Sequence, residues 1–312
     1  MNDAQFDLRQ LRQFAVLAEE CHFGRAAARL AMTQPPLTQA IQRLEAALGA
    51  RLFERSQRRV ALSPAGEVLL PLARKLLEGA DALAPAVRAA AAGLSGQLRL
   101  AFVSSVTYGP LPGWLAGFRA AYPDVALSLR EATLDVQLEL FAAGEIDAGF
   151  VLHAPGAVPP GFEHVRVIDE ALVMALPESH AALRGRASEG ARLRWREIAS
   201  EPLVIFPRQI APSLFDALVS AYHADGHVMR VAQQAIQMQT IVNLVSGGMG
   251  VAWVPESLTH LQRAGVRYAR VGGQPGAALR CETSLVWRSG APPVVARFVD
   301  HVRANVKGAR AR

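Results

Sequence analysis

The sequence predicts an α/β protein with an N-terminal winged helix-turn-helix, a long linker helix and a two-lobed C-terminal domain. Apolar residues recur at helical spacing near the N-terminus, and strand-like and helix-like segments alternate in two sets after residue 96. A length of 312 residues allows two or three domains at roughly 100–200 residues each. We expect a winged helix-turn-helix domain at 1–62, a linker helix at 63–93 and a two-lobed domain at 94–312.

Composition excludes several classes of protein. The chain is 51% hydrophobic with a net charge of +6, which is too apolar for a disordered protein. Met1 to Gln5 lack the basic and apolar regions of a signal peptide, and charges or glycines interrupt the most apolar stretches. Cys21 and Cys281 provide neither a disulfide framework nor zinc-ligand spacing. We therefore expect a cytoplasmic protein without metal, cofactor or membrane partner.

Positive charge is concentrated at the two ends of the chain. Residues 1–60 hold nine arginines against six acids, and residues 303–312 hold four cations and no acid. The 242 residues between them carry a net charge of −1. This distribution suggests a nucleic-acid module joined to a neutral domain with another task. A general arginine bias is an equal explanation for the tail, because lysine occurs only at Lys75 and Lys307.

Three helices are predicted in the first 50 residues. The first occupies residues 8–18, and the second occupies residues 23–30 with alanines on its inner face. The third carries apolar residues at spacings of 4, 3 and 4 and ends at Gly49. A short turn and small residues at the crossing indicate that the second and third helices form a helix-turn-helix. The apolar positions of the third helix are Leu37, Ile41, Leu44 and Leu48.

The polar face of the third helix is the predicted reading surface for double-stranded DNA. Glutamine and arginine can make bidentate contacts with base edges in the major groove. Pro35 and Pro36 lack the N–H that a capping Thr33 would bind, so we expect the helix to begin at Pro35 or Pro36. The Thr33 hydroxyl is then available for a phosphate, and the proline rings can contact thymine methyl groups. The predicted DNA-contacting residues of this region are Thr33, Gln34, Pro35, Pro36, Thr38, Gln39, Gln42 and Arg43.

A basic hairpin follows the third helix. Residues 51–55 and 60–62 are strand-like, and the tip between them carries arginines, as in the wing of a winged helix. Arg55, Arg58 and Arg59 suit contacts to the DNA backbone or minor groove, which position a module without specifying sequence. The alternative is an ordinary solvated helix face beside a basic loop.

The linker helix is predicted to begin at the Ser63-Pro64 cap and to extend to about Gly93. Its narrow apolar stripe suits pairing with the linker helix of another chain. The alternative is a core helix of a single domain. The stripe consists of Leu69, Leu72, Leu76, Leu83 and Val87.

The remaining residues predict two α/β lobes with a cleft between them. Strand–helix alternation predicts parallel sheets covered by helices, and ligands bind at the carboxyl ends of such strands. We place lobe I at about 94–167 and 272–312, and lobe II at about 168–271. Strands are expected at 97–103, 125–131, 147–152, 171–176, 203–206, 228–232, 251–254, 266–271 and 283–287, and helices at 111–121, 134–143, 213–224, 237–246 and 293–306.

One long motif resembles the LysR-type transcriptional regulators. It runs from Ala26-Ala27 through Thr33-Gln34-Pro35-Pro36-Leu37-Thr38 and Leu48-Gly49 to Leu52-Phe53 and Arg55, and it continues at Leu62-Ser63 and Ala65-Gly66. The resemblance implies an effector domain like a periplasmic binding protein, and homodimers that assemble into a homotetramer. It also implies a promoter operator, a small-molecule effector and action through RNA polymerase. Gln39 departs from the family, which often has arginine or lysine there.

The effector site is expected at the strand ends of both lobes. Ser104, Ser105 and Val106 follow the first strand, where backbone N–H groups and hydroxyls can bind a carboxylate. The guanidinium of Arg208 can fork onto a carboxylate, although it could equally pair with a nearby acid. Ser105 and Thr133 could instead be turn or cap residues. Through the resemblance, the predicted effector contacts are Ser104, Ser105, Val106, Thr133, Leu152, Pro207, Arg208, Gln237 and Thr240.

Leu152 limits the class of ligand that we expect in the effector site. Family members that respond to aromatic acids or muconate often carry arginine at this position, two residues after Gly-Phe. A dicarboxylate held by such an arginine is not supported here. The resemblance therefore favours a small organic acid with one carboxylate, or a less charged aromatic compound.

Two other functions would use different features of the chain. A redox-sensing regulator of the same family would use Cys21 or Cys281, but the two cysteines lie in different predicted domains. A solute-binding protein or enzyme with an accidental helix-turn-helix is the other alternative. The sequence contains no nucleophile elbow and no phosphate-binding loop of the P-loop type, so we do not expect an enzyme.

Overall fold

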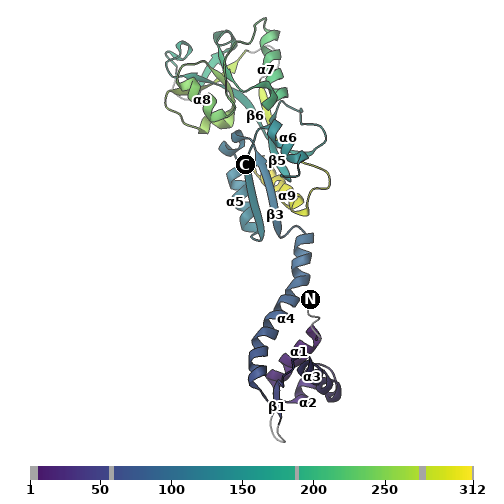
Figure 1. Cartoon of the computed structure of the whole chain (residues 1–312). Helices are drawn as coiled ribbons and strands as arrows, with labels where there is room; N and C mark the ends of the chain where they lie inside the picture. The colour runs from purple at the N-terminus through teal and green to yellow at the C-terminus, as the bar shows by residue number, and fades with distance from the viewer. Residues whose placement is uncertain (1–5, 56–59, 187–189, 274–278, 311–312) are drawn as a thin grey trace. The chain divides into compact units, whose positions relative to one another are not determined.

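A computed structural model describes residues 6–55, 60–186, 190–273 and 279–310, which form two compact units (Figure 1). The first unit is Met1–Ala89 and the second is Ala90–Arg312. Among these described residues, no helix is long and apolar enough to cross a membrane.

The first unit is a winged helix-turn-helix followed by a long helix. Asp7 and Gln10 exchange hydrogen bonds of 2.8 and 2.9 Å at the start of the first helix, which is a capping box. His22 caps the second helix by accepting from the N–H groups of Gly24 and Arg25. The elements are α1 (Leu8–Glu20), α2 (Phe23–Arg29), α3 (Gln34–Leu48), β1 (Phe53–Arg55), β2 (Val60–Leu62) and α4 (Pro64–Ala91).

The start of α3 differs by one or two residues from the prediction. The helix begins at Gln34, although the residue before a proline is sterically biased against helical geometry. Pro35 and Pro36 occupy the first turn, where no intrahelical N–H bond is required. Thr33 has an extended conformation and its side chain makes no capping hydrogen bond, as predicted.

The α4 helix is capped and packed at its N-terminal end. The Ser63 hydroxyl accepts from the Gly66 N–H at 3.1 Å and donates to the Arg51 carbonyl at 2.6 Å. Ala73 and Leu77 are buried against the helix-turn-helix. Leu69, the first residue of the predicted stripe, is partly buried there. The other stripe residues are exposed by 55–68%: Leu72, Leu76, Leu83 and Val87.

The second unit contains two α/β lobes. Lobe I comprises β3 (Gly96–Phe102), η1 (Ser104–Tyr108), α5 (Leu111–Ala121), β4 (Val125–Glu131), α6 (Leu134–Ala142), β5 (Ala148–His153) and α9 (Pro293–Arg310). Lobe II comprises η2 (Ala181–Leu183), β7 (Ala191–Arg194), η3 (Trp195–Glu197), β8 (Leu203–Ile205), η4 (Arg208–Ile210), α7 (Pro212–Ala224), β9 (Val231–Gln234), α8 (Met238–Ser246), β10 (Ala252–Pro255), η5 (Glu256–His260) and β11 (Val266–Gly272). Two further strands, β6 (Glu163–Pro177) and β12 (Arg280–Trp287), pair with each other and complete the unit.

The predicted parallel sheets are in fact mixed. β3 pairs in parallel with β4 and β5, and β11 with β7. However, β12 is antiparallel to both β5 and β6, and β10 and β11 are antiparallel to β6. The reason is that β6 is long enough to serve both lobes, and later strands return alongside it. The path of the main sheet is β4-β3-β5-β12-β6-β11-β7.

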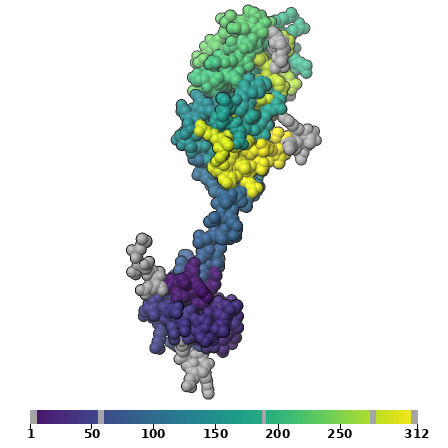
Figure 2. Space-filling view, turned by 90° about the vertical axis from the view of Figure 1, so that its right-hand side faces the viewer, coloured from purple at the N-terminus to yellow at the C-terminus, as the bar shows by residue number. Residues whose placement is uncertain are grey.

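Two predicted strands also needed correction. The strand expected at 171–176 is the second half of β6, whose first half is half-exposed and polar and so lacks a buried-strand signal. The strand expected at 228–232 is β9, which begins at Val231 and is exposed along its length. Each lobe nevertheless has its own apolar core. Figure 2 shows the C-terminal residues lying over lobe I, where Phe298 and Val302 are fully buried.

Candidate functional site

The α3 helix presents a polar surface opposite its buried stripe. Leu37, Ile41 and Leu44 are fully buried, which fixes the rotation of the helix. Thr38 is half-buried and its hydroxyl donates to the Gln34 carbonyl at 3.1 Å, which leaves its oxygen able to accept a hydrogen bond. The other predicted contacts of this region are all exposed: Thr33, Gln34, Pro35, Pro36, Gln39, Gln42 and Arg43.

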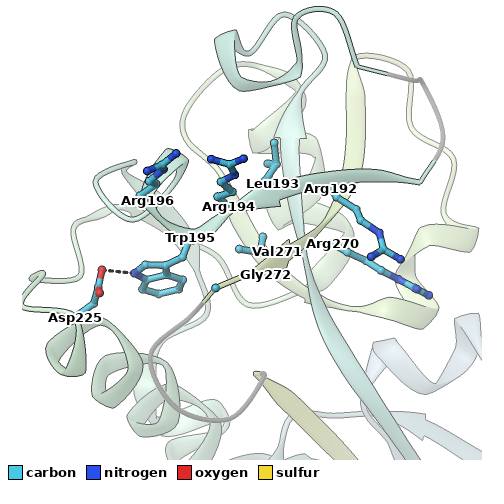
Figure 3. Close-up of a pocket in the computed structure, with 10 residues that line it drawn as sticks. Arg192, Leu193, Arg194, Trp195, Arg196, Asp225, Arg270, Val271 and Gly272 are labelled. Carbon is cyan, nitrogen blue, oxygen red and sulfur yellow. Dashed lines mark hydrogen bonds between the residues drawn. The ribbon is translucent and has the colours of Figure 1, made fainter.

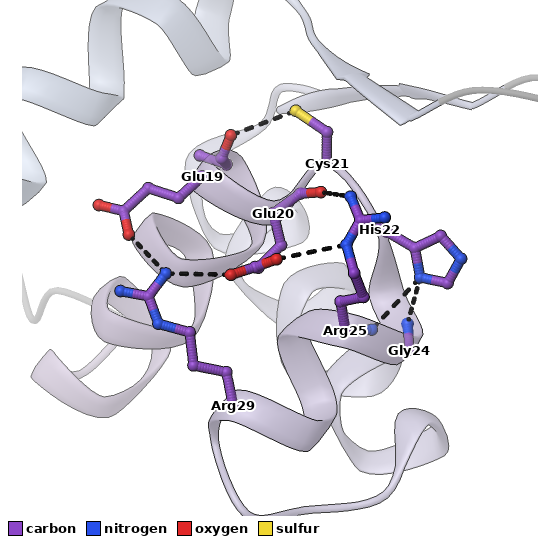
Figure 4. Close-up of polar contacts among 8 residues, drawn as sticks. Glu19, Glu20, Cys21, His22, Gly24, Arg25 and Arg29 are labelled. Carbon is purple, nitrogen blue, oxygen red and sulfur yellow. Dashed lines mark hydrogen bonds and ion pairs between the residues drawn. The ribbon is translucent and has the colours of Figure 1, made fainter.

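Charged side chains brace the first two helices against each other (Figure 4). Arg29 forms ion pairs with Glu19 at 2.9 Å and Glu20 at 3.2 Å, and Arg25 contacts Glu20 at 3.3 Å. Arg74 on α4 reaches Glu19 at 3.0 Å. The hydrogen bond from Arg74, together with Arg29, lowers the pKa of the Glu19 carboxyl. These arginines are therefore engaged in ion pairs within the first unit.

The wing is attached to α3 through Glu45. Its carboxylate accepts from the N–H groups of Leu52 at 2.8 Å and Phe53 at 3.3 Å. These bonds set the point at which the hairpin leaves the helix. Arg58 and Arg59 lie outside the described residues, as does the side chain of Arg55, so their roles stay predictions.

A cavity of about 30 Å³ lies between the two lobes of the second unit. On this measure one water molecule needs roughly 10–15 Å³, so the cavity has room for about two water molecules and not for a larger ligand. Apolar side chains dominate its wall and no charged residue lines it. The predicted effector residues among its lining are Ser104, Ser105, Thr133, Leu152 and Gln237.

Ser105 is the distinctive polar residue of this cavity. It is 3% exposed, and its hydroxyl has no hydrogen-bond partner among the described residues. The Thr133 hydroxyl, by contrast, donates to the Asp135 carboxylate. An unpaired buried hydroxyl costs about 1–3 kcal/mol. A group that entered the cavity and bonded to Ser105 would recover part of that energy.

Two short 3₁₀ helices bring the lobes together beside the cavity. The η1 helix of lobe I begins at Ser104, and its last carbonyl, that of Tyr108, lies 3.1 Å from Nδ1 of His260 at the end of η5 in lobe II. At the other end of η5, the Glu170 carboxylate of β6 accepts from the N–H and the hydroxyl of Ser257. Burial raises the pKa of Glu170, and its bonds with Ser257 oppose the rise. The η1 helix that begins at the cavity is thus in contact with lobe II at its other end.

Comparisons with known proteins find family models that match both parts of the chain. A family model for the bacterial regulatory helix-turn-helix protein of the lysR family matches residues 8–67, and one for the LysR substrate binding domain matches residues 91–307. The chain belongs to the LysR family. The transcriptional regulator IlvR of Caulobacter vibrioides is 44% identical over 283 residues, which are 90% of this chain and 92% of that protein.

Two further relatives of this LysR-family chain extend the similarity. The transcriptional regulator TcbR of a Pseudomonas species is 34% identical over 302 residues, which are 96% of this chain and 99% of that protein. The crystal structure of full-length CbnR in complex with its target DNA has a TM-score of 0.80 at 32% identity, covering 96% of this chain and all of that one. The LysR-family chain is thus a DNA-binding transcriptional regulator with an effector-binding domain, and not an enzyme.

Four predicted effector residues of the LysR-family domain do not line the cavity. Val106 is buried in the core of lobe I, while Pro207 and Thr240 lie outside the lining. Arg208 is exposed, and its guanidinium forms two bonds of 2.7 Å with the Asp216 carboxylate. The geometry thus favours the alternative interpretation of Arg208, a surface arginine paired with a nearby acid.

Sequence reasoning missed the apolar part of the cavity wall. Most of these residues lie beside predicted polar residues, at the ends of the same strands. The strand ends therefore predicted the place of the cavity correctly, but considering only polar residues left out its apolar wall. A buried apolar residue beside a site cannot be distinguished by type from one in the core. The missed lining residues are Val103, Ala132, Phe206, Ile210, Ala211, Ile236 and Met238.

The two cysteines do not favour a redox sensor. Cys21 is exposed in the first unit and Cys281 is buried in the second. Burial raises the pKa of the Cys281 thiol well above its ordinary value, and the Glu170 carboxylate adds to the rise. Because the thiolate is the reactive form, Cys281 is a poor nucleophile.

Proposed function

We propose that this LysR-family regulator changes its action at a promoter when a small organic acid with one carboxylate binds between its two lobes. The observation that carries this proposal is the buried Ser105 hydroxyl, which has no partner among the described residues and lies in a mostly apolar cavity. Hydroxyls and the backbone N–H groups at the start of η1 can bind one carboxylate, and the apolar wall suits a hydrocarbon body.

The small volume of the cavity links binding to movement. A molecule of several carbon atoms exceeds about 30 Å³, so its entry requires the lobes to separate. That separation would strain the contact between Tyr108 and His260. A ligand that prefers the separated arrangement shifts the population of the domain by its difference in affinity for the two arrangements.

The first unit supplies the DNA-binding surface in this proposal. Thr33 and the prolines would contact the phosphate backbone and thymine methyl groups, while Gln39, Gln42 and Arg43 would face base edges. The exposed apolar side chains from Leu72 to Val87 on α4 would pair with a second copy. The resulting homodimer, its assembly to a tetramer, a cytoplasmic location and action on RNA polymerase belong to the same proposal.

Calorimetry on the full chain tests the ligand site. The probes are benzoate and isovalerate, each compared with its methyl ester. We expect one of the acids to bind, its ester to bind less, and Ser105→Ala to weaken binding about tenfold, as for the loss of one hydrogen bond to a charged group. Ser220→Ala is the matched control, because that serine is exposed on α7. Equal affinities for the parent and Ser105→Ala would remove Ser105 from the site.

A further inference from the structure

A second, larger pocket opens on lobe II, away from the residues of the effector cavity. Its volume is about 760 Å³, within the range of roughly 300–1,000 Å³ typical of small-molecule sites. Figure 3 shows the side chains around it. Four arginines line this arginine pocket: Arg192, Arg194, Arg196 and Arg270.

The sheet places two of these arginines side by side. β7 and β11 are parallel neighbours, and Arg192 is the register partner of Arg270. Both side chains extend in the same direction in Figure 3. Arg192 and Arg194 alternate with buried Ala191 and Leu193, so they share the exposed face of β7. Like charges directly opposite in a sheet are destabilising, so this arrangement favours a bound anion.

Among the described residues, most of this positive charge has no carboxylate partner. Elsewhere in the unit, Arg99 pairs with Asp147 and Arg280 with Asp169. In the arginine pocket, the ion pairs of the described residues include Arg270 with Glu256 at 2.5 Å. Across the ranges that the structure describes, no carboxylate forms an ion pair with Arg192, Arg194 or Arg196.

The acid that lines the pocket is already engaged. The Asp225 carboxylate accepts a hydrogen bond of 2.6 Å from the Trp195 indole and lies 3.1 Å from His227. The Asp225 carboxylate therefore holds the Trp195 side chain in the wall of the pocket. A ligand that satisfied the three unpaired guanidinium groups would have to bring its own negative charge.

The structure also excludes one way of binding an acidic partner. β7 is the last strand in the path of its sheet, so an extended peptide could in principle pair with its outer edge. That edge is covered by an ion pair between Arg186 and Glu197 at 2.6 Å. The Arg186 guanidinium donates to the Arg192 carbonyl, and the Glu197 carboxylate accepts from the Arg194 N–H at 2.7 Å. Recognition must therefore use the arginine side chains rather than strand addition.

We propose that the arginine pocket binds phosphate groups, and specifically a ligand that carries two or more of them. Planar guanidinium groups match phosphate oxygens in bidentate pairs. Arg192 and Arg270 extend to one side of the pocket and Arg194 and Arg196 lie on the other, which suits a ligand with two or more phosphates (Figure 3). The phosphates can come from a soluble polyphosphate compound, such as a nucleoside triphosphate, or from the backbone of DNA.

Calorimetry on the full chain with inorganic tripolyphosphate tests the soluble source. The variant Arg192→Gln/Arg194→Gln removes two exposed charges, and Arg119→Gln/Arg230→Gln is the control, because both control arginines are also exposed. We expect the parent and the control to bind equally, and the pocket variant to bind at least about tenfold more weakly. The pocket variant should unfold at a temperature no lower than the parent, since its replaced side chains lie in solvent and the loss of Arg192 removes a like charge beside Arg270.

Binding to a mixed-sequence DNA duplex at several salt concentrations tests the other source. If DNA supplies the phosphates, the pocket variant should reduce the salt slope by about 0.9 for each phosphate that the two arginines neutralise in the parent, and the control should not. A reduced slope without tripolyphosphate binding assigns the pocket to DNA. The proposal is overturned if the pocket variant changes neither tripolyphosphate affinity nor the salt slope relative to the control.

Discussion

The polar face of α3 and the cavity between the lobes differ in how they present their polar groups: the face exposes them and the cavity buries them. The face displays Gln39, Gln42 and Arg43 to solvent on a helix whose rotation is fixed by three buried side chains. The cavity hides Ser105 among apolar residues and leaves its hydroxyl without a partner. A surface for a large, charged partner needs exposed donors on a rigid support, whereas a small ligand must be surrounded.

Because of this difference, we expect the two regions to respond differently to substitutions. The proposed reading surface of α3 depends on the packing of that helix, so we expect a defect in packing to remove it. The cavity is assembled from strand ends of both lobes, so a single substitution there changes affinity while the lobes still fold. Mutations can therefore separate the two functions.

The largest effect is expected from Gly66→Ala in the first unit. A Cβ atom at Gly66 would lie 2.2 Å from the Leu52 carbonyl oxygen and 2.8 Å from Leu62 Cδ2, so backbone would have to move. We expect a loss of about 3 kcal/mol in the stability of this unit, the upper part of the usual range for overpacking. DNA binding should be lost while ligand binding by the second unit is retained, measured by mobility shift and calorimetry.

Gly79→Ala is the control for that substitution. Gly79 also lies on α4, has ordinary helical geometry, and a Cβ atom there meets nothing within 4 Å. Alanine should stabilise the helix by about 0.5–1 kcal/mol. If Gly66→Ala bound DNA like Gly79→Ala, the packing of α4 against Leu52 could not be what supports the DNA-binding surface.

The sequence predicts well the features that depend on residues close together in the chain. It predicts less well the features that depend on contacts between distant segments. The spacing of Leu37, Ile41 and Leu44 alone identifies the buried side of α3, and hence its exposed side. The mixed sheet could not be predicted in this way, because strand direction depends on where β12 returns along β6. Arg208 illustrates the same limit, since the Asp216 that neutralises it lies eight residues away on the next helix.

A smaller and more specific effect is expected from Gln42→Ala. If this amide reads a base edge, its loss should remove about 2 kcal/mol of discrimination at one base pair and leave sequence-independent binding intact. Selection from a random-sequence duplex library measures the preference directly. Gln97→Ala is the control, because Gln97 is an exposed glutamine in the second unit. An unchanged selected motif would show that the exposed face of α3 does not read sequence through Gln42.

The smallest effect should come from the ion pairs that brace the helix-turn-helix, and it should depend on pH. Arg74 and Arg29 lower the pKa of Glu19 from its ordinary value of 4.5. A lowered pKa in the folded state stabilises the fold above pH 4.5, and this contribution disappears as the pH falls through the lowered value.

Glu19→Gln tests that contribution in urea unfolding of the first unit. Glu19 is 37% exposed, so solvent screening should keep the loss below about 1 kcal/mol at neutral pH. The difference between parent and variant should vanish in acid, where the parent carboxyl is also neutral. Glu78→Gln, an exposed position on α4, should show no such convergence. A difference that persisted unchanged in acid would mean that the Glu19 side chain acts through packing, and the helix-turn-helix would then owe its rigidity to its apolar core alone.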